Sequence, residues 1–364
     1  MATLGPNDLK QYALPSTWDA SYLAKISLES GETYEQLIND ITGALAVQNA
    51  ALLRESIVAS LCSPTADAVV EYPNGVSNGF QDATEYGVPD AKRASVTGHM
   101  LPLYPKDRAF AWTWQFLSKA RRAQIDADIA SGMADLRNLY HKAILTRLFK
   151  STYDSVGTGK SCPIADGGTA DSSYVPPQNP DRATAFAYTH SHLGRLSGIT
   201  QANLETGVAH VWEHGFDGPF DLLVAQADVS SWRNTTNVTG FVANRLPLIG
   251  YGSSETLADA GPDVVGVIET AYGPVRVRAS ARIPTKYWAV YKSFGPVDAR
   301  NPLKIRYNPK YGIGAILLAG DHIRQYPLEN AILYTELGVG VADRVAAYVC
   351  YNESSGSYTD PTIS

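Results

Sequence analysis

Apolar residues recur every three or four positions between Arg121 and Lys150. The stripe that they form contains Ile125, Ile129, Met133, Leu136, Tyr140 and Ile144. This spacing places them on one face and predicts a long amphipathic helix over the segment. Gly132 lies near the middle, where a glycine costs about 1 kcal/mol relative to alanine. We therefore expect a bend or close packing at Gly132.

An alternating pattern precedes this helix, between Arg108 and Phe116. Its large aromatic residues share one face of the predicted strand, and they are Phe110, Trp112, Trp114 and Phe116. We expect a turn at Tyr104–Asp107, which makes residues 94–103 the expected partner strand. The aromatic face has two explanations. It is either core within this subunit or the face of a projecting hairpin that a neighbouring subunit covers.

The N-terminal part of the chain is less regular. Polar, mixed residues at 1–33 predict an extended arm, and helical spacing between Thr33 and Leu61 predicts one or two helices. Residues 63–93 are rich in Gly, Asp and Pro, and residues 153–182 are rich in the same types and in Ser. We expect the second of these segments to be a long loop.

Helices and strands mix in the C-terminal half. A helix is predicted over Thr200–His214, closed by Gly215. Strands are predicted at 220–225, 275–283, 315–318, 331–337 and 342–351, and a polar tail follows at 353–364. Within 275–283, the alternation places Arg276, Arg278, Ser280 and Arg282 on one face.

Composition narrows the class of protein. Hydrophobic residues make up 45% of the 364 positions and charged residues 18%, so the chain can bury a core. The net charge of −6 supplies no global basic field that would attract the phosphate backbone of nucleic acid. No apolar run approaches the roughly 18–20 residues of a membrane span, so we expect no membrane partner.

The cysteines and the N-terminus point to the site of synthesis. Cys62, Cys162 and Cys350 are widely spaced and odd in number, which is not a disulfide framework. The first residues lack a basic region followed by an apolar stretch, so no signal peptide is predicted. We expect synthesis in a reducing cytoplasm.

Candidate chemistry is sparse. The segment Val156–Ser161 ends like a phosphate-binding loop, but Asp154 stands where the first glycine is required. His190, His192, His210 and His214 are clustered in the sequence, and His210 and His214 have a zinc-compatible spacing of four. The sequence His-Val-Trp-Glu-His does not match HExxH, so we expect structural or surface histidines, with a metal site as the alternative. We predict no catalytic, cofactor-binding or metal-binding residue and no cofactor.

Several segments, in this order, resemble the major capsid proteins of tailed bacteriophages, which have the HK97-like fold. Residues 83–95 resemble the tip of the extended E-loop, Ala109–Ala120 its returning strand, and Arg121–Lys150 the spine helix of the P-domain. Thr200–Asp228 is similar to the central helix and strand of the A-domain. Tyr326–Asn330 and Gly338–Val349 resemble the closing segment.

The resemblance implies an α+β, HK97-like capsid fold with six segments. They are an N-terminal arm with a helix (1–64), the E-loop (65–117), the P-domain spine helix (118–152), a mixed α/β A-domain (153–297), P-domain strands (298–338), and a closing strand with a C-terminal tail (339–364). The resemblance also favours contacts between subunits as the role of the four aromatic residues at 110–116. It assigns the stripe from Ile125 to Ile144 to packing of the spine helix.

The function implied is a major capsid protein of the virion that self-assembles into an icosahedral shell around a phage dsDNA genome, without sequence-specific binding. Its partners would be copies of itself in pentamers and hexamers, scaffolding and portal proteins, and a decoration protein. No coiled-coil scaffold segment precedes the arm, which favours a separate scaffolding protein. The alternative is an encapsulin-like nanocompartment that encloses cargo enzymes. An α+β enzyme is the third possibility, and it would need a convergent polar pocket.

Overall fold

The structure, a computed structural model, describes residues 28–29, 31–73, 87, 96–117, 119–156, 159–165, 191–243, 263–319 and 328–363. Nearly all of the expected arm and E-loop tip, most of the expected loop at 153–182, and His190 lie outside these residues. Among the helices described, none is long and apolar enough to cross a membrane.

The chain divides into two compact units, which are described separately. Unit 1 contains residues 1–54, 103–141 and 307–338, and unit 2 contains residues 55–102, 142–306 and 339–364. Several of the expected segments have residues in both units. The expected E-loop is divided after Pro102, and the expected spine segment after His141.

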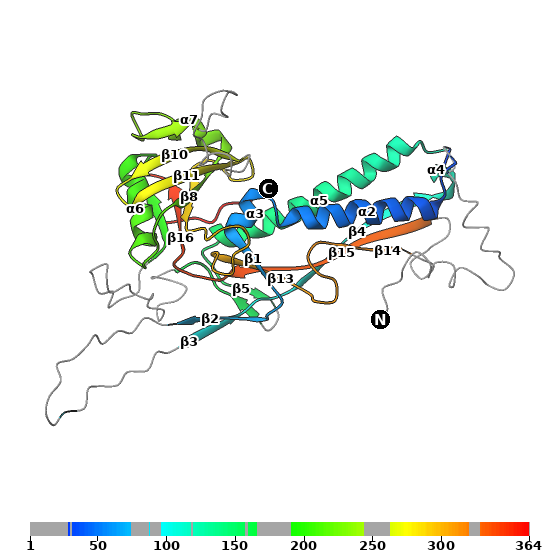
Figure 1. Cartoon of the computed structure of the whole chain (residues 1–364), viewed down its shortest axis with the longest axis horizontal. Helices are drawn as coiled ribbons and strands as arrows, with labels where there is room; N and C mark the ends of the chain where they lie inside the picture. The colour runs from blue at the N-terminus through cyan, green and yellow to red at the C-terminus, as the bar shows by residue number, and fades with distance from the viewer. Residues whose placement is uncertain are drawn as a thin grey trace, which may run out of the picture. The chain divides into compact units, whose positions relative to one another are not determined.

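Unit 1 contains an antiparallel group of strands in the order β4, β15 and β14 (Figure 1). Their bounds are β4 Tyr104–Thr113, β14 Ile316–Ala319 and β15 Leu328–Val341, whose last three residues belong to unit 2. Strand β4 pairs with β15 from Tyr104↔Leu337 to Thr113↔Leu328. The expected turn at Tyr104–Asp107 is therefore wrong, because those four residues are paired strand.

Helix α2, Tyr34–Leu52, begins at a capping box. Thr33 Oγ1 accepts from the N–H of Gln36, and Gln36 Oε1 accepts from the N–H of Thr33. Its buried residues Leu37, Ile41 and Leu45 follow the helical repeat. Asn49 near its end donates to Ala315 O at 2.8 Å and accepts from Ala315 N at 3.1 Å, which joins the helix to the start of β14.

Helix α5, Arg122–Phe149, starts in unit 1 and ends in unit 2. All six residues of the predicted stripe are buried, with exposed fractions of 8% or less. The helix starts at an ionic junction, where Arg122 lies 2.7 Å from Glu32, 2.9 Å from Asp40 and 2.8 Å from Asp126. Tyr140 accepts from Gly314 N at 2.8 Å, so both ends of the unit 1 part of α5 have polar partners.

Unit 2 is built on a seven-stranded mixed sheet. In sheet order its strands are β7 Leu193–Leu196, β16 Ala347–Asn352, β12 Tyr287–Tyr291, β8 Phe220–Ala225, β11 Gly273–Ser280, β10 Val264–Thr270 and β9 Phe241–Ala243. Strand β8 matches its prediction at both ends, and all six of its residues are buried. Burial of every residue is typical of a strand covered on both faces, and Asp221 is the one charged residue among the six.

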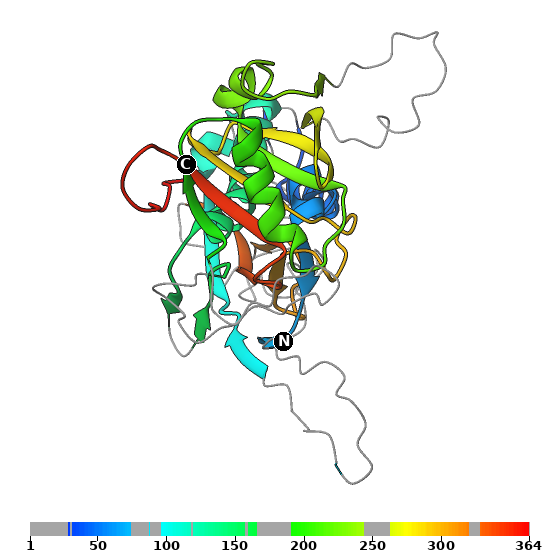
Figure 2. The same ribbon diagram turned by 90° about the vertical axis from the view of Figure 1, so that its left-hand side faces the viewer.

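Helix α6, Gln201–Trp212, lies on this sheet, with Leu204, Val208 and Val211 fully buried (Figure 2). Thr200 caps its start, and Gly215 follows its end with a φ of 96°, a backbone conformation that favours glycine. The Cβ of an alanine at Gly207 would lie 2.9 Å from the Trp288 ring, so the glycine permits close packing on β12. A short 3-10 helix, Gln226–Asp228, and α7, Val229–Trp232, follow β8.

A buried ion cluster involves the arginine residues of β11. Asp221 on β8 is fully buried and accepts from Arg276 at 2.8 Å and from Arg278 at 3.1 Å. Arg278 also lies 3.1 Å from Asp263 and donates to Ser56. Burial lowers the pKa of Arg278, but Tyr291, Asp221 and Asp263 raise it and the net shift is upward. On the arginine face of β11, Arg278 is therefore buried with its charge paired, and Arg276 is one-third exposed and shares the Asp221 carboxylate.

Other short elements complete unit 2. They are α3 Ser56–Leu61, β1 Cys62–Thr65, β2 Val69–Pro73, β3 Val96–Met100, β5 Asp154–Val156, β6 Gly159–Ser161 and β13 Leu303–Tyr307, whose last residue belongs to unit 1. Strand β1 pairs in parallel with β13. Fully buried Asn301 donates to Ala59 O at 3.1 Å and to Gly295 O at 3.0 Å, which joins α3 to the loop before β13.

The C-terminal segment, expected as a polar tail, is packed within unit 2. Tyr358 donates to Phe149 O at 2.6 Å, and Asp360 accepts from Ser151 N at 2.8 Å. Tyr287 donates to Thr359 O at 2.8 Å, and Ile363 is 3% exposed. The three cysteines are all described, buried and outside any disulfide.

Candidate assembly surface

The aromatic strand differs from the sequence prediction. Strand β4 ends at Thr113, and Trp114 and Phe116 lie in a one-turn helix, α4 Trp114–Leu117. Alternation therefore continues only to Trp112, and the four aromatic residues do not share a strand face. Phe110 and Trp112 are 5% and 4% exposed within the chain itself. Their assignment to a surface between subunits is wrong, because this chain already covers both.

Helix α5 is what covers them. The Phe110 and Trp112 rings stack at a centroid distance of 5.5 Å, and Trp112 Nε1 donates to Asp128 on α5 at 3.2 Å. An alanine Cβ at Gly132 would lie 2.5 Å from the Phe110 ring. The expectation of close packing at Gly132 is confirmed. Any assembly role of this region must therefore come from other residues.

A two-stranded ribbon provides such residues. Strand β3 pairs with β2 and not with β4, which corrects the expected partner of the aromatic strand. One face of the ribbon is packed. Val70 is 5% exposed, and the His99 ring lies 5.8 Å from that of Tyr153. The ribbon contacts β6 through β3, and Figure 1 shows β2 and β3 side by side.

The other face of the ribbon is apolar and exposed. Val69 and Met100 are directly paired and so lie on one face, with exposed fractions of 47% and 39%. Glu71 and Gly98 are also directly paired, and each lies two residues along its strand from Val69 or Met100, so they share the same face. A two-stranded ribbon is marginally stable alone, which makes its two exposed apolar side chains a candidate contact surface. We call Val69, Glu71, Gly98 and Met100 the ribbon face.

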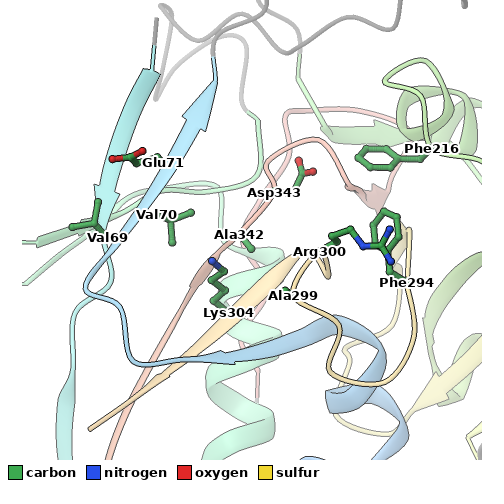
Figure 3. Close-up of a pocket in the computed structure, with 10 residues that line it drawn as sticks. All are labelled: Val69, Val70, Glu71, Phe216, Phe294, Ala299, Arg300, Lys304, Ala342 and Asp343. Carbon is green, nitrogen blue, oxygen red and sulfur yellow. The ribbon is translucent and has the colours of Figure 1, made fainter. Parts of the chain in front are cut away.

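A pocket of about 540 Å³ adjoins the ribbon face, as Figure 3 shows. Its lining comes from strand β2, strand β13 with the segment before it, and the segments after α6 and after β15. It comprises Val69, Val70, Glu71, Phe216, Phe294, Ala299, Arg300, Lys304, Ala342 and Asp343. The Arg300 guanidinium lies over the Phe294 ring at 4.4 Å and pairs with Asp298 at 3.0 Å. Ala342 N donates to Pro302 O at 2.7 Å, which fixes the floor.

Charges in this pocket are only partly paired. The hydrogen bonds and ionic contact from Arg300 lower the pKa of Asp298 to about 2. Desolvation raises the pKa of Asp343, although the N–H groups of Val345 and Ala346 partly offset that effect. Within the described part of the chain, Glu71 and Lys304 have no ion-pair partner. The pocket therefore combines an apolar edge with one available charge of each sign.

The candidate chemical residues have other positions. The segment that ends like a phosphate-binding loop contains the β5–β6 hairpin, so its Gly-Lys-Ser lies on a strand and not at a helix start. His192, His210 and Glu213 form a group whose ligand atoms lie within 4.8 Å of one another. The sequence analysis did not identify Glu213 or the ribbon face as candidate functional residues. The only sequence feature that could have indicated Glu213 is its position between His210 and His214.

Comparisons with known proteins support the architecture. No protein-family model matches the chain, and no curated protein matches it significantly. A solved structure from Mycobacterium phage Patience is 23% identical, with a TM-score of 0.64, and the match covers 96% of this chain and 97% of that one. The bacteriophage PhiM1 mature capsid is 13% identical, with a TM-score of 0.48 and coverages of 82% and 87%. The SrpI encapsulin complex from Synechococcus elongatus is 12% identical, with a TM-score of 0.43 and coverages of 83% and 88%.

The match to the Patience structure spans nearly the whole of both chains, so it describes the fold and not one shared motif. The class of fold is α+β, with the helices and sheets described above. The fold is the HK97-like fold, as the order of sequence segments predicted.

Proposed function

We propose that this chain is a major capsid protein that assembles into a closed icosahedral shell around a phage dsDNA genome. The observation that carries the proposal is an HK97-like fold, matched over 96% of the chain, with an exposed apolar ribbon face. The role proposed is a structural one, supported by a fold shared over nearly the whole of both chains with a solved phage structure. The protein would be made in the host cytoplasm and reside in the virion capsid.

The segments take the following roles in the proposal. The β2–β3 ribbon is the described stem of the E-loop, and α5 with strands β4, β14 and β15 forms the P-domain. The seven-stranded sheet with α6 forms the A-domain, which would meet its copies at capsomer centres. Each contact between subunits would be heterologous, so rotational symmetry closes the shell.

The ribbon face and its pocket are the proposed contact with a second copy. Full burial of a side chain such as Val or Met contributes about 1.5–3 kcal/mol relative to exposure. Val69 and Met100 are 47% and 39% exposed in the free chain, so a neighbour that covers them would gain a little under half of this contribution from each. Glu71 and Lys304 would set the orientation, because misplaced like charges oppose the wrong register. Scaffolding, portal and decoration proteins are the further partners proposed.

The test is a charged ribbon face. Val69→Lys with Met100→Lys places two ammonium groups where the neighbour would be apolar, while both side chains remain accessible to water in the free subunit. We expect wild-type circular dichroism and a melting temperature close to wild type, together with loss of closed shells in negative-stain images. Expression with the phage's own assembly partners provides the wild-type shells for comparison.

Val47→Lys is the matched control, because Val47 on α2 is also an exposed valine, at 72%. Normal shells from the control and none from the double variant support the ribbon face. Normal shells from both variants remove this face from the mechanism. Wild-type protein that stays monomeric with all assembly partners present contradicts a capsid function. Wild-type shells that enclose enzymes and no DNA favour the nanocompartment.

A further inference from the structure

The end of helix α6 brings three potential metal ligands to one side. His210 lies in the last turn, Glu213 is the C-cap residue, and His214 follows it. The turn stays compact because His214 N bonds to Val211 O at 3.3 Å and Gly215 N to Trp212 O at 2.9 Å. Residues three and four apart on a helix are surface neighbours, and a pair of histidines four apart is a known zinc-binding spacing.

A fourth ligand comes from the edge of the sheet. His192 precedes β7, and its N–H and C=O bond to Ala165 O at 2.7 Å and Val349 N at 2.8 Å. Its Nδ1 lies 2.9 Å from Ala347 O. A carbonyl oxygen only accepts, so Nδ1 carries the proton and Nε2 of the neutral ring has a lone pair. Metal-bound histidines typically donate their other ring N–H to such a carbonyl.

The ligand atoms of His192, His210 and Glu213 all lie within 4.8 Å of one another, and His214 contacts two members of this group. His192 Nε2 lies 3.0 Å from His214 Nε2, and His210 Nδ1 lies 3.3 Å from Glu213 Oε1. His214 Nε2 lies 3.9 Å from Glu213 Oε1. Zinc–nitrogen distances of about 2.0–2.1 Å place neighbouring tetrahedral ligands about 3.4 Å apart. The three measured separations scatter around that value.

Burial and surroundings favour a closed site over a catalytic one. The side chains of His192 and His214 are inaccessible to water, and those of His210 and Glu213 are 31% and 27% exposed. Tyr348 on β16 stacks on the His210 ring at 4.8 Å with an interplanar angle of 4°. Burial of His192 and His214 and the stacking of Tyr348 on His210 therefore restrict the positions of the three imidazole rings. His192, His210 and Glu213, with His214 as the adjacent fourth side chain, can therefore supply the four protein ligands that are typical of a structural zinc site.

We propose that His192, His210, Glu213 and His214 form a structural Zn²⁺ site that joins the end of α6 to the β7–β16 edge of the sheet. This replaces the expectation of structural histidines that sequence spacing favoured. One carboxylate and three imidazoles suit zinc, and the carboxylate offsets part of its charge. The site lies wholly in unit 2 and does not depend on the proposed capsid function.

Untagged protein from zinc-supplemented expression, desalted and measured by plasma mass spectrometry, tests the site. We expect about one Zn²⁺ per chain, a fall in Tm on chelation and its recovery on addition of Zn²⁺ alone. Cobalt substitution should give the visible absorption of a tetrahedral centre. His210→Gln and Glu213→Gln alter partly exposed ligands, so each should fold in the metal-free state and hold less than about a tenth of a zinc per chain.

His99→Gln is the control, since His99 lies on β3 outside the group, and it should keep its zinc. Protein that contains no zinc and shows no change in Tm with added Zn²⁺ overturns the proposal. The His192–His214 contact is then a hydrogen bond between two neutral rings. Zinc that both glutamine variants retain also overturns it, because the ion is then bound elsewhere.

Discussion

Two helical glycines in unit 1 allow the packing of α5 on β4 to be measured. Gly132 lies on α5, where an added Cβ would lie 2.5 Å from both Arg108 and the Phe110 ring. Gly43 lies on α2, where an added Cβ would have nothing within 4 Å. Both glycines are within helices, so Gly→Ala has the same effect on the helical backbone at each position. Only the contacts of the new methyl group differ.

The expected magnitudes follow from these contacts. Gly43→Ala should raise the free energy of unfolding by about 1 kcal/mol through helix propensity. Gly132→Ala has the same gain, but inserting a methyl group into a filled core costs about 1–3 kcal/mol. The Arg108 tip can move aside, whereas the Phe110 ring is 5% exposed and stacked on Trp112. We therefore expect Gly132→Ala to be less stable than Gly43→Ala by about 1–3 kcal/mol.

Urea unfolding of the purified subunit, followed by circular dichroism, measures both changes. A double-mutant cycle then identifies the contact. In a Phe110→Ala background the ring is gone, so Gly132→Ala should recover the gain seen at Gly43. Equal stabilisation by the two glycine substitutions in the wild-type background would refute the close approach of α5 and β4. Failure of Phe110→Ala to change the effect would assign the clash to another neighbour.

Two further predictions concern unit 2. Asp221→Asn leaves Arg276 and Arg278 without their shared carboxylate and should lower the free energy of unfolding by about 3–5 kcal/mol. Asp298→Asn, at an exposed ion pair, should leave the urea unfolding curve unchanged. Equal effects of the two substitutions would contradict the burial of the Asp221 pair. Burial, with smaller contributions from Tyr351 and Asp360, raises the pKa of Tyr287 to about 12. The folded value then exceeds the unfolded one of about 10, so the stability it contributes is complete below pH 10 and is lost between pH 10 and about 12. Tyr287→Phe should show a smaller fall in Tm over that range, and an identical fall would mean that Tyr287 is not the group responsible.

Periodicity predicted the elements with strong patterns. Helix α5 begins and ends within one residue of its predicted bounds, and β8 matches at both ends. The predictions of the helical stripe and of the mainly apolar segment of β8 succeeded because both patterns are bounded by clear signals. The predicted strand at 108–116 was wrong beyond Thr113. The alternating sequence pattern continues into residues that form a one-turn helix in the structure. Four residues of α4 are too short for the two periods to be told apart.

The sequence by itself determined the order of helices and strands, the apolar faces and the absence of familiar catalytic motifs, since these depend on neighbours along the chain. Only the tertiary structure decided that Phe110 and Trp112 are core, that β3 pairs with β2, and that His192 meets Glu213. Those outcomes depend on contacts between residues far apart in sequence. Strand pairing and burial are decided by which surfaces meet, and a local pattern specifies a surface without specifying its partner.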